Sequence, residues 1–226
     1  MVIKSAVLEK IPNLVYGFGT LEEPLSVPLL KSSWETNRPQ WKQVHGVSVA
    51  HVQKIRQECG EVDALYTFEM DLPIGVVTAD CVPILMSDHL GSKVVAIHAG
   101  WRGTLNRIVR QVWKELSGHG ENPKNWVAAI GPAIGPCCYE VSEEVAANFV
   151  NQFKNIGPAK ISPRHRILDL QAINSEELRE IGISEVEVIQ MCTRCTPGPL
   201  FNSYRRSKEE GLASGRQWSV ISRYKT

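Results

Sequence analysis

The sequence lacks several features that would indicate particular classes of protein. Neither sign of charge is in excess, since 25 Lys and Arg residues are balanced by 24 Asp and Glu residues, and there is no run of five like charges. A non-specific nucleic-acid-binding protein normally carries a basic excess, so we expect no nucleic-acid partner. The longest apolar stretches, such as Ile74–Val77 and Val94–Ile97, are far shorter than a membrane span.

The N-terminal ten residues lack the apolar core of a signal peptide, and no repeat or low-complexity segment is present. We therefore expect a cytoplasmic protein without a membrane partner. The 226 residues, of which 43% are hydrophobic and 22% charged, have the composition of a globular protein. They predict a single domain over residues 1–226, and we expect it to be a monomer.

Six cysteines are present, but thiols stay reduced in the cytoplasm, so they do not predict a disulfide framework. Cys192 and Cys195 form a C-x-x-C pair, whereas a zinc ribbon uses two such pairs. This pair is therefore expected to lie in a structural loop and not to act as a catalytic redox pair. Cys137 and Cys138 follow a segment rich in glycine and proline, which predicts a structural turn with one buried thiol.

Apolar runs and cap residues predict an α/β protein with mixed sheets. Strands are expected over residues 44–52, 74–79, 82–86, 93–97, 126–130 and 185–190, and residues 21–40 are expected to be irregular. Pro83 indicates an edge or a bend in its strand. Thr104 is the predicted cap of a helix with an apolar stripe formed by Leu105, Ile108, Val109, Val112 and Leu116. Further helices are expected after Ser142 and from Asp169 to Gly182.

Three candidate reactive residues, His45, Cys81 and His98, stand at or near the ends of predicted strands. Two imidazoles and a thiolate suit zinc, and three protein ligands leave a fourth position open. Their long separations in the sequence have no intrinsic geometry, so simple packing or hydrogen bonding of each side chain is the competing interpretation.

The segment His98–Thr104 carries a second candidate feature. Gly100 and Gly103 would let backbone N–H groups approach a ligand at a helix start, and Arg102 offers a two-pronged donor for phosphate or carboxylate. A plain strand-to-helix turn is the alternative. The basic and aromatic residues 201–206, with Gly215 and Arg216, either close a site over an anionic substrate or form a solvated surface.

These motifs, taken together and in order, resemble the YfiH family, which is also called the laccase-domain or multicopper polyphenol oxidase-like family. The resemblance rests on residues 43–46, 63–65, 78–83, 98–104, 131–132, 139–141, 203–206 and 215–216, and runs from about Leu14 to the C-terminus. It implies a four-layer α/β/β/α sandwich, similar to cysteine-hydrolase-like toxin domains. It also implies a metal site on His45, Cys81 and His98, with zinc as the expected metal and copper as the alternative.

The activities implied by the resemblance are purine nucleoside phosphorolysis, adenosine deamination, polyphenol oxidation and a peptidoglycan-editing amidase reaction, which removes misincorporated serine from a cell-wall precursor. One motif departs from the family pattern. Members usually carry Phe-Ser-Thr-Arg-x-Gly-Gly after the first strand, whereas this chain has Phe18-Gly19-Thr20 followed by Leu21-Glu22-Glu23. An acidic patch thus replaces an expected cation.

Chemistry narrows these activities. Only six histidines are present, too few for the four copper ions of a true laccase, and the H-x-E and P-C-x-x-C motifs of cytidine-deaminase-type enzymes are missing. The preferred interpretation is a metal-dependent purine nucleoside enzyme acting on a small-molecule nucleoside with phosphate. The alternatives are the amidase acting on a cell-wall precursor, then a copper-dependent polyphenol oxidase, and a metal-dependent binding module is the non-enzymatic option.

Two catalytic schemes stay open on the same residues. In the first, zinc on His45, Cys81 and His98 activates water or phosphate. In the second, Cys81 is a nucleophile and His98 is its base. In either scheme Gln43, Asp80 and Arg102 are the expected substrate-binding residues.

Overall fold

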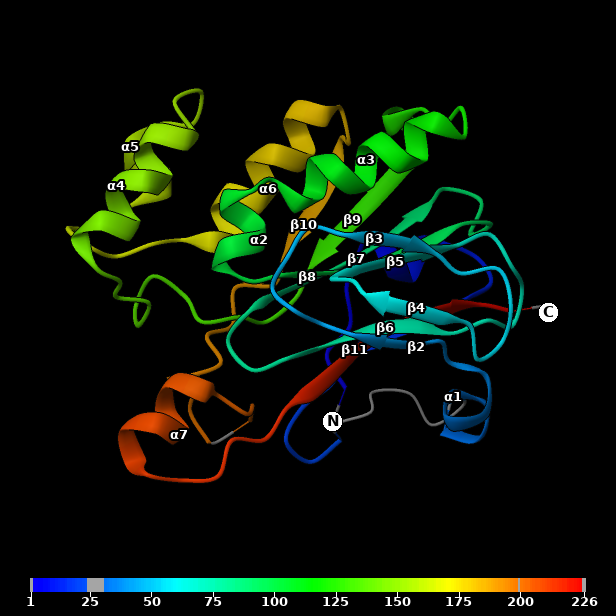
Figure 1. Cartoon of the computed structure of the whole chain (residues 1–226), viewed down its shortest axis with the longest axis horizontal. Helices are drawn as coiled ribbons and strands as arrows, with labels where there is room; N and C mark the ends of the chain where they lie inside the picture. Colours follow the sequence, from blue (N-terminus) through cyan, green and yellow to red (C-terminus); the bar gives the residue numbers. More distant parts are fainter. Residues whose placement is uncertain (1, 24–30, 199, 225–226) are drawn as a thin grey trace.

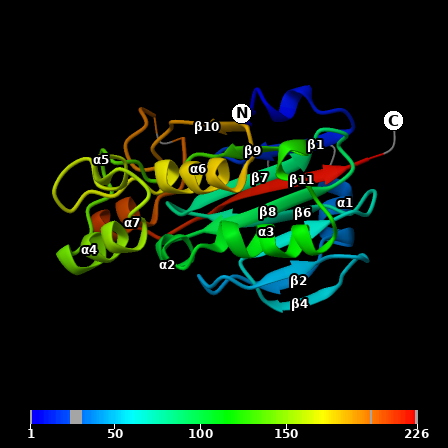
Figure 2. The ribbon, with the colours of Figure 1, turned by 90° about the horizontal axis from the view of Figure 1, so that it is seen from above.

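The computed structural model describes residues 2–23, 31–198 and 200–224. Its central layer is a six-stranded sheet in the order β10 (Glu185–Val188), β9 (Trp126–Ile130), β7 (Val82–Asp88), β8 (Val94–Ala99), β5 (Ala64–Thr67) and β3 (Val49–His51). A three-stranded antiparallel sheet, β1 (Leu14–Phe18), β11 (Gln217–Arg223) and β6 (Ile74–Thr78), packs against one face. A parallel pair, β2 (Gln40–Lys42) and β4 (Glu58–Glu61), lies beside them (Figure 1 and Figure 2).

Helices cover the other face of the central sheet. They are α2 (Trp101–Leu105), α3 (Ile108–Gly118) and α6 (Leu170–Ile181), with α4 (Glu143–Gln152) and α5 (Pro158–Ile161) extending to one side. On the outer face of the three-stranded sheet, Trp34 of α1 (Lys31–Asn37) packs against Val15 and Val220. Two short 3-10 turns, Leu8–Lys10 and Pro123–Asn125, and helix α7 (Tyr204–Glu210) complete the described elements. The expected mixed α/β class with several sheets is confirmed.

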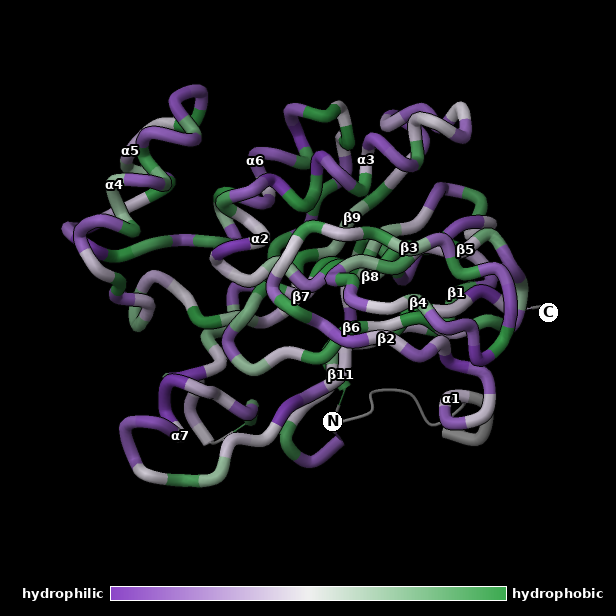
Figure 3. The backbone as a smooth tube through the Cα atoms, in the orientation of Figure 1, coloured by the Kyte–Doolittle hydropathy of each residue, from purple (hydrophilic) through white to green (hydrophobic). Residues whose placement is uncertain are grey.

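The central strands are buried on both faces because their side chains alternate between two cores. Along β7, Ile84 and Met86 face the helices, while Leu85 faces the three-stranded sheet. In Figure 3 the hydrophobic colours gather along these strands, whereas α7 is mainly hydrophilic. Among the described residues, no helix combines the length and apolar character needed to cross a bilayer.

The prediction that Pro83 marks an edge strand is wrong, because β7 lies between β9 and β8 in the central sheet. The N–H of Gly131 donates to the Pro83 carbonyl at 2.8 Å. Proline has no N–H to return to the Gly131 carbonyl, and that carbonyl accepts from Gln171 Nε2 at 2.8 Å instead. A side-chain amide therefore replaces the missing ladder bond.

Other boundaries also differ from those expected. The predicted strand over residues 44–52 is reduced to β3, because His45 has a φ of 61° and lies in a loop. Thr104 lies inside α2 and does not cap a long helix, since Arg107 in the left-handed region separates α2 from α3. The buried stripe from Ile108 to Leu116 is nevertheless present. Residues 21–40, expected to be irregular, include α1, while residues 24–30 lie outside the described part.

Candidate metal and substrate site

Strand register brings Cys81 and His98 together. The antiparallel pair β7 and β8 places Val82 opposite Ala99, so Cys81 stands beside Gly100 and close to His98. His98 is 2% exposed and Cys81 is half-buried. The two side chains therefore meet at one end of the neighbouring strands, where β7 begins and β8 ends.

Asp63 brings His45 to the same point. Its carboxylate, which is fully buried, accepts hydrogen bonds from the backbone N–H groups of Val44, His45 and Gly46 at 3.2, 2.9 and 2.7 Å. Because β5 pairs antiparallel with β8, Asp63 also lies opposite His98, and its Oδ1 is 2.7 Å from His98 Nδ1. The Asp63 side chain thus holds both the loop that carries His45 and the imidazole ring of His98.

The three candidate ligand atoms, from His45, Cys81 and His98, lie within 4.8 Å of one another. Because Asp63 contacts His98 at Nδ1, the other ring nitrogen, Nε2, is left to face the candidate ligand group. A carboxylate at the second nitrogen is the usual partner of a metal-binding histidine. The structure therefore brings together the three residues singled out from the sequence. Their roles as metal ligands or as catalytic groups stay predictions.

Gly100 leaves space beside these atoms. A Cβ placed on Gly100 would lie 3.0 Å from His45 Cδ2 and 3.2 Å from Cys81 Sγ. Its φ of −68° suits any residue, so space and not backbone conformation requires the glycine. The donor set and this small cradle fit a bound ion.

A Gly100→Ala variant is expected to keep its fold and to bind metal at least about tenfold more weakly, because the added methyl displaces two ligands by a few tenths of an ångström. Isothermal titration of the metal-free protein with zinc measures this. Gly118→Ala is the matched control, because a Cβ there meets nothing within 4 Å. If the group formed by His45, Cys81 and His98 bound zinc equally well in the two variants, the result would contradict a metal site beside Gly100.

The electrostatics of the metal-free site couple these residues. Burial raises the pKa of the Cys81 thiol, but hydrogen bonds and charges from His45 and His98 outweigh burial and bring the pKa to about 7. Burial lowers the pKa of His98, but Asp63 and Cys81 outweigh it and raise the pKa to about 9. Burial also acts to raise the pKa of Asp63, yet its bonds from His98 and the loop N–H groups hold that pKa below 3.8. Near pH 7 a substantial fraction of Cys81 is therefore thiolate, and it faces an imidazolium.

Alkylation of metal-free protein is expected to show this thiolate. The rate at which iodoacetamide modifies Cys81 should rise with a midpoint near pH 7, because only the thiolate reacts. Cys59 is the internal comparison, since burial raises its pKa above 9.0. Peptide mapping by mass spectrometry follows both residues in one sample. A common midpoint for the two cysteines would contradict the coupling of Cys81 to the histidines.

The site opens into a cavity of about 790 Å³ whose charged lining is mainly positive. Among the described residues, its lining includes six cations, Arg38, Lys42, Arg102, Arg205, Lys208 and Arg216, against one carboxylate, that of Asp80. Five aromatic side chains, Trp41, Trp101, Tyr139, Tyr204 and Trp218, also line it. The segment around residues 201–206 and Arg216, left open by the sequence, thus contributes to the cavity wall and supplies cations.

The three expected substrate-binding residues differ in their freedom to bind. Arg102 is exposed, lies over the Trp101 ring at 4.4 Å, and within the described residues forms no ion pair. Gln43 lines the cavity, but its amide pairs with both backbone groups of Val77, at 2.8 and 2.9 Å. Asp80 accepts from Thr193 Oγ1 at 2.6 Å and from the Arg205 N–H at 2.7 Å, so it joins the loop after β10 to the start of α7.

The expected anion site at a helix start is not supported by the geometry. Helix α2 has only five residues, and Gly103 lies inside it, where a Cβ would meet the Gly46 carbonyl at 3.0 Å. Gly103 therefore permits close packing against the His45 loop. The sequence prediction assigned no role to Asp63, and its position becomes informative only once the pairing of β5 with β8 is known.

The fold and site together define a mixed α/β protein in which a candidate N/S/N ligand set lines a cationic, aromatic cavity. A sequence profile for the family described as multi-copper polyphenol oxidoreductase laccase matches residues 28–224. The chain belongs to this family, to which the YfiH proteins also belong.

Curated relatives and solved structures agree with this assignment. The chain is 32% identical over 186 residues to purine nucleoside phosphorylase YfiH of Escherichia coli strain K12, covering 81% of this chain and 75% of that protein. It is 35% identical over 167 residues to adenosine deaminase RL5 of an unknown prokaryotic organism, covering 72% of this chain and 62% of that protein. The crystal structure of YlmD from Geobacillus stearothermophilus superposes with a TM-score of 0.81 at 28% identity, covering 96% of this chain and 94% of YlmD.

Proposed function

We propose that this chain is a metal-dependent purine nucleoside enzyme that cleaves adenosine or inosine with phosphate, and that can also deaminate adenosine. The observation that carries the proposal is the cavity, in which an N/S/N donor set, several cations and aromatic faces meet. Its volume of about 790 Å³ is in the range of small-molecule sites. Relatives named for these two reactions support the same assignment.

His45, Cys81 and His98 are the residues that would hold the metal. A thiolate with two imidazoles suits zinc best and copper second. A bound zinc ion supplies a Lewis acid at the base of the cavity. Asp63 sets the tautomer of His98, and Gly100 keeps the space beside the ligands free.

The cations of the cavity would hold phosphate. Arg102, Lys208 and Arg216 are exposed side chains on its wall, and a guanidinium binds phosphate through two parallel hydrogen bonds. Phosphorolysis joins a phosphate oxygen to C1′ of the ribose and breaks the C1′–N9 bond. The bonding pair and a proton go to the leaving purine. Arg102, Lys208 and Arg216 would therefore bind the phosphate dianion next to C1′.

The aromatic residues would hold the purine base. Trp101, Tyr139 and Trp218 are half-buried, so each offers a partly desolvated ring face for stacking. Burial, and next the charge of Cys81, raise the pKa of Tyr139, so its phenol keeps the proton and serves as a hydrogen-bond donor. Donors of this kind fit the ring nitrogens of a purine.

The peptidoglycan-editing amidase is the second candidate, and one observation favours it. Asp63, His98 and Cys81 stand in the order of an orienting acid, a base and a nucleophile, with a thiol pKa of about 7. The thiolate would attack the carbonyl carbon of the amide, and His98 would give its proton to the departing serine amine. Water would then hydrolyse the thioester.

A copper-dependent polyphenol oxidase is disfavoured by the histidines. Oxygen reduction by laccases uses a mononuclear copper and a trinuclear cluster. In the described part of the chain, His45 and His98 belong to a single three-ligand group, whereas His51 and His119 pack against Tyr66 and Phe68. One histidine-containing site does not provide the ligands for four coppers.

Mass spectrometry of products tests the proposal on zinc-loaded protein. Adenosine and inosine are incubated with and without phosphate, beside a serine-containing UDP-MurNAc precursor. We expect ribose 1-phosphate and free base only with phosphate, and inosine from adenosine without it. The Arg102→Gln variant should raise the KM for phosphate, and Lys114→Gln, which removes a charge from the exposed side of α3, should not. Serine release without nucleoside turnover would favour the amidase.

A further inference from the structure

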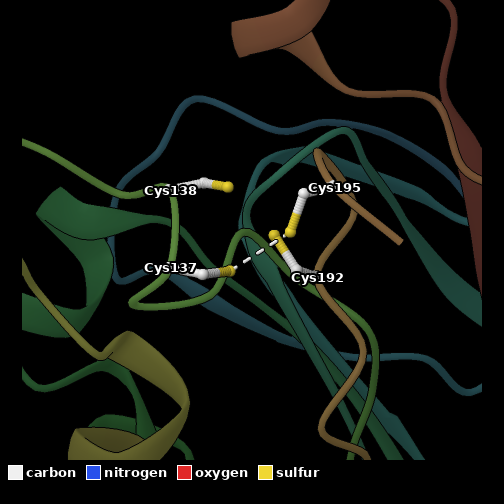
Figure 4. A group of neighbouring side chains, drawn as sticks. All are labelled: Cys137, Cys138, Cys192 and Cys195. Atoms are coloured by element: carbon white, nitrogen blue, oxygen red, sulfur yellow. Dashed lines mark hydrogen bonds between the residues drawn. The ribbon is translucent and has the colours of Figure 1, made fainter. Parts of the chain in front are cut away.

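Four of the six cysteines meet at a second point, beside the cavity. Cys137 and Cys138 lie in the loop after β9, and Cys192 and Cys195 lie in the loop after β10. Their sulfur atoms lie within 4.8 Å of one another. Figure 4 shows two side chains from each loop pointing into one shared space. Neither pair is close to the other in the sequence.

The spacing of the four sulfur atoms fits one metal ion. With Zn–S bonds of 2.3 Å, the sulfurs of a tetrahedral site are about 3.8 Å apart. Here the Cys137 and Cys195 sulfurs are 3.3 Å apart, and all pairs are within 4.8 Å, so small side-chain rotations complete the tetrahedron. An iron–sulfur cluster would place its thiolates on different iron atoms and hence farther apart. All four are free thiols.

We propose that Cys137, Cys138, Cys192 and Cys195 bind a structural zinc ion, separate from the ligand set at His45. Packing does not account for these thiols, because Cys137 and Cys195 are exposed and the other two are half-buried. The expectation of a buried thiol at residues 137–138 is therefore wrong. Four protein thiolates fill the coordination sphere, which is typical of a structural and not a catalytic zinc site.

Neighbouring donors suit the charge of such a site. Zinc with four thiolates carries two negative charges in excess. The Gly135 N–H donates to Cys192 Sγ at 3.3 Å, and the Arg194 guanidinium donates to Cys138 Sγ at 3.7 Å. Hydrogen bonds to the ligands from surrounding groups are a regular part of metal sites.

The zinc would fasten the two loops that build one wall of the cavity. Tyr139, which lines the cavity, follows Cys138 directly, and Thr193, between Cys192 and Cys195, donates to Asp80. The second Asp80 oxygen accepts from the Arg205 N–H, so the loop after β10 is tied to α7 as well. The zinc site thus positions Tyr139 and Arg205 without touching the substrate.

Metal analysis of the full chain tests this proposal. Wild-type protein purified with zinc is expected to hold two zinc ions per chain, and the Cys192→Ser variant one. Cys59→Ser is the matched control and should keep both, because Cys59 lies apart on β4. In the cobalt-substituted protein, Cys192→Ser should remove the strong sulfur-to-cobalt absorption of the four-cysteine site. An unchanged zinc content in Cys192→Ser, or iron in place of zinc, would overturn the proposal.

A measurement on wild-type protein covers the case in which the variant does not fold. Zinc should protect all four cysteines from iodoacetamide together, and a chelator should release all four together, as read by peptide mapping. An intact mass showing disulfides among these residues in freshly purified protein would refute the zinc site. Failure of the His45 site would not affect this result, because Cys81 is mapped as a separate peptide.

Discussion

Replacing His45 by asparagine is expected to lower nucleoside turnover by at least about a thousandfold, since even residues outside the ligand set change metal affinity or activity by roughly 10–100-fold. The variant should also lose one zinc ion per chain and keep the zinc of the four-cysteine site. Asparagine is the right replacement because residue 45 has a φ of 61°, which asparagine tolerates better than alanine. Steady-state kinetics and metal analysis of the same preparation measure both effects.

This variant separates the two schemes for Cys81. A thiol enzyme needs Cys81, His98 and Asp63, all of which the variant keeps, so serine release by an amidase should fall much less. His89→Asn is the matched control, because it removes an exposed imidazole away from the cavity. Full turnover by metal-free protein, together with rapid loss of activity on Cys81 alkylation, would show that the thiol scheme is correct.

The core of the fold could be predicted from local sequence patterns. Strands β6 to β9 are short apolar runs, and the caps at Ser142 and Asp169 accept from Val145 and Ala172 as their residue types predict. The errors arose where a distant residue decides the conformation. His45 lies in a loop because Asp63 binds three successive N–H groups there.

The candidate site was found through motifs and not through spacing. Nothing in the separations of His45, Cys81 and His98 predicts that they meet, because the register of β7 on β8 and of β5 on β8 is set by tertiary packing. Asp63 belongs to one of the family motifs, but the motif alone indicates no role for it. Its position before β5, next to the strand that carries His98, becomes informative only once that pairing is known.

The four-cysteine cluster was missed because each pair was interpreted alone. A single C-x-x-C is too little to predict a zinc ribbon, and the segment before Cys137 and Cys138 predicts only a turn. Strands β9 and β10 are parallel neighbours, with Val188 opposite Ile130, so the loops that follow them leave the sheet at the same edge. A topology prediction pairing these two strands would have brought all four thiols together.

The Asp63→Asn variant is expected to weaken both the fold and the metal site. The carboxylate accepts from three backbone N–H groups and contacts His98, whereas an amide turns one acceptor oxygen into a donor. Facing donors are then left unpaired, which should lower the free energy of unfolding by about 2–4 kcal/mol. Zinc affinity of the His45 site should fall by roughly 10–100-fold, because the ring of His98 loses its orienting partner.

The loss of stability should depend on pH with a defined sign. The folded state holds the pKa of Asp63 below 3.8, so this carboxylate stabilises the protein above that pH, and the contribution is lost as pH falls through the lowered pKa. The difference between wild type and Asp63→Asn should therefore be large at neutral pH and shrink in acid. Chemical denaturation of metal-free protein from pH 7 to pH 3 measures it.

Asp88→Asn is the matched control for this prediction. Asp88 is also a buried carboxylate, and it accepts from the N–H groups of Ser92 and Lys93 and from the Ser92 hydroxyl. It lies outside the cavity lining, so its variant should lose a similar amount of stability and keep full zinc affinity at the His45 site. If the two variants bound zinc equally well, Asp63 would be a purely structural residue, and its contact with His98 would have no part in forming the metal site.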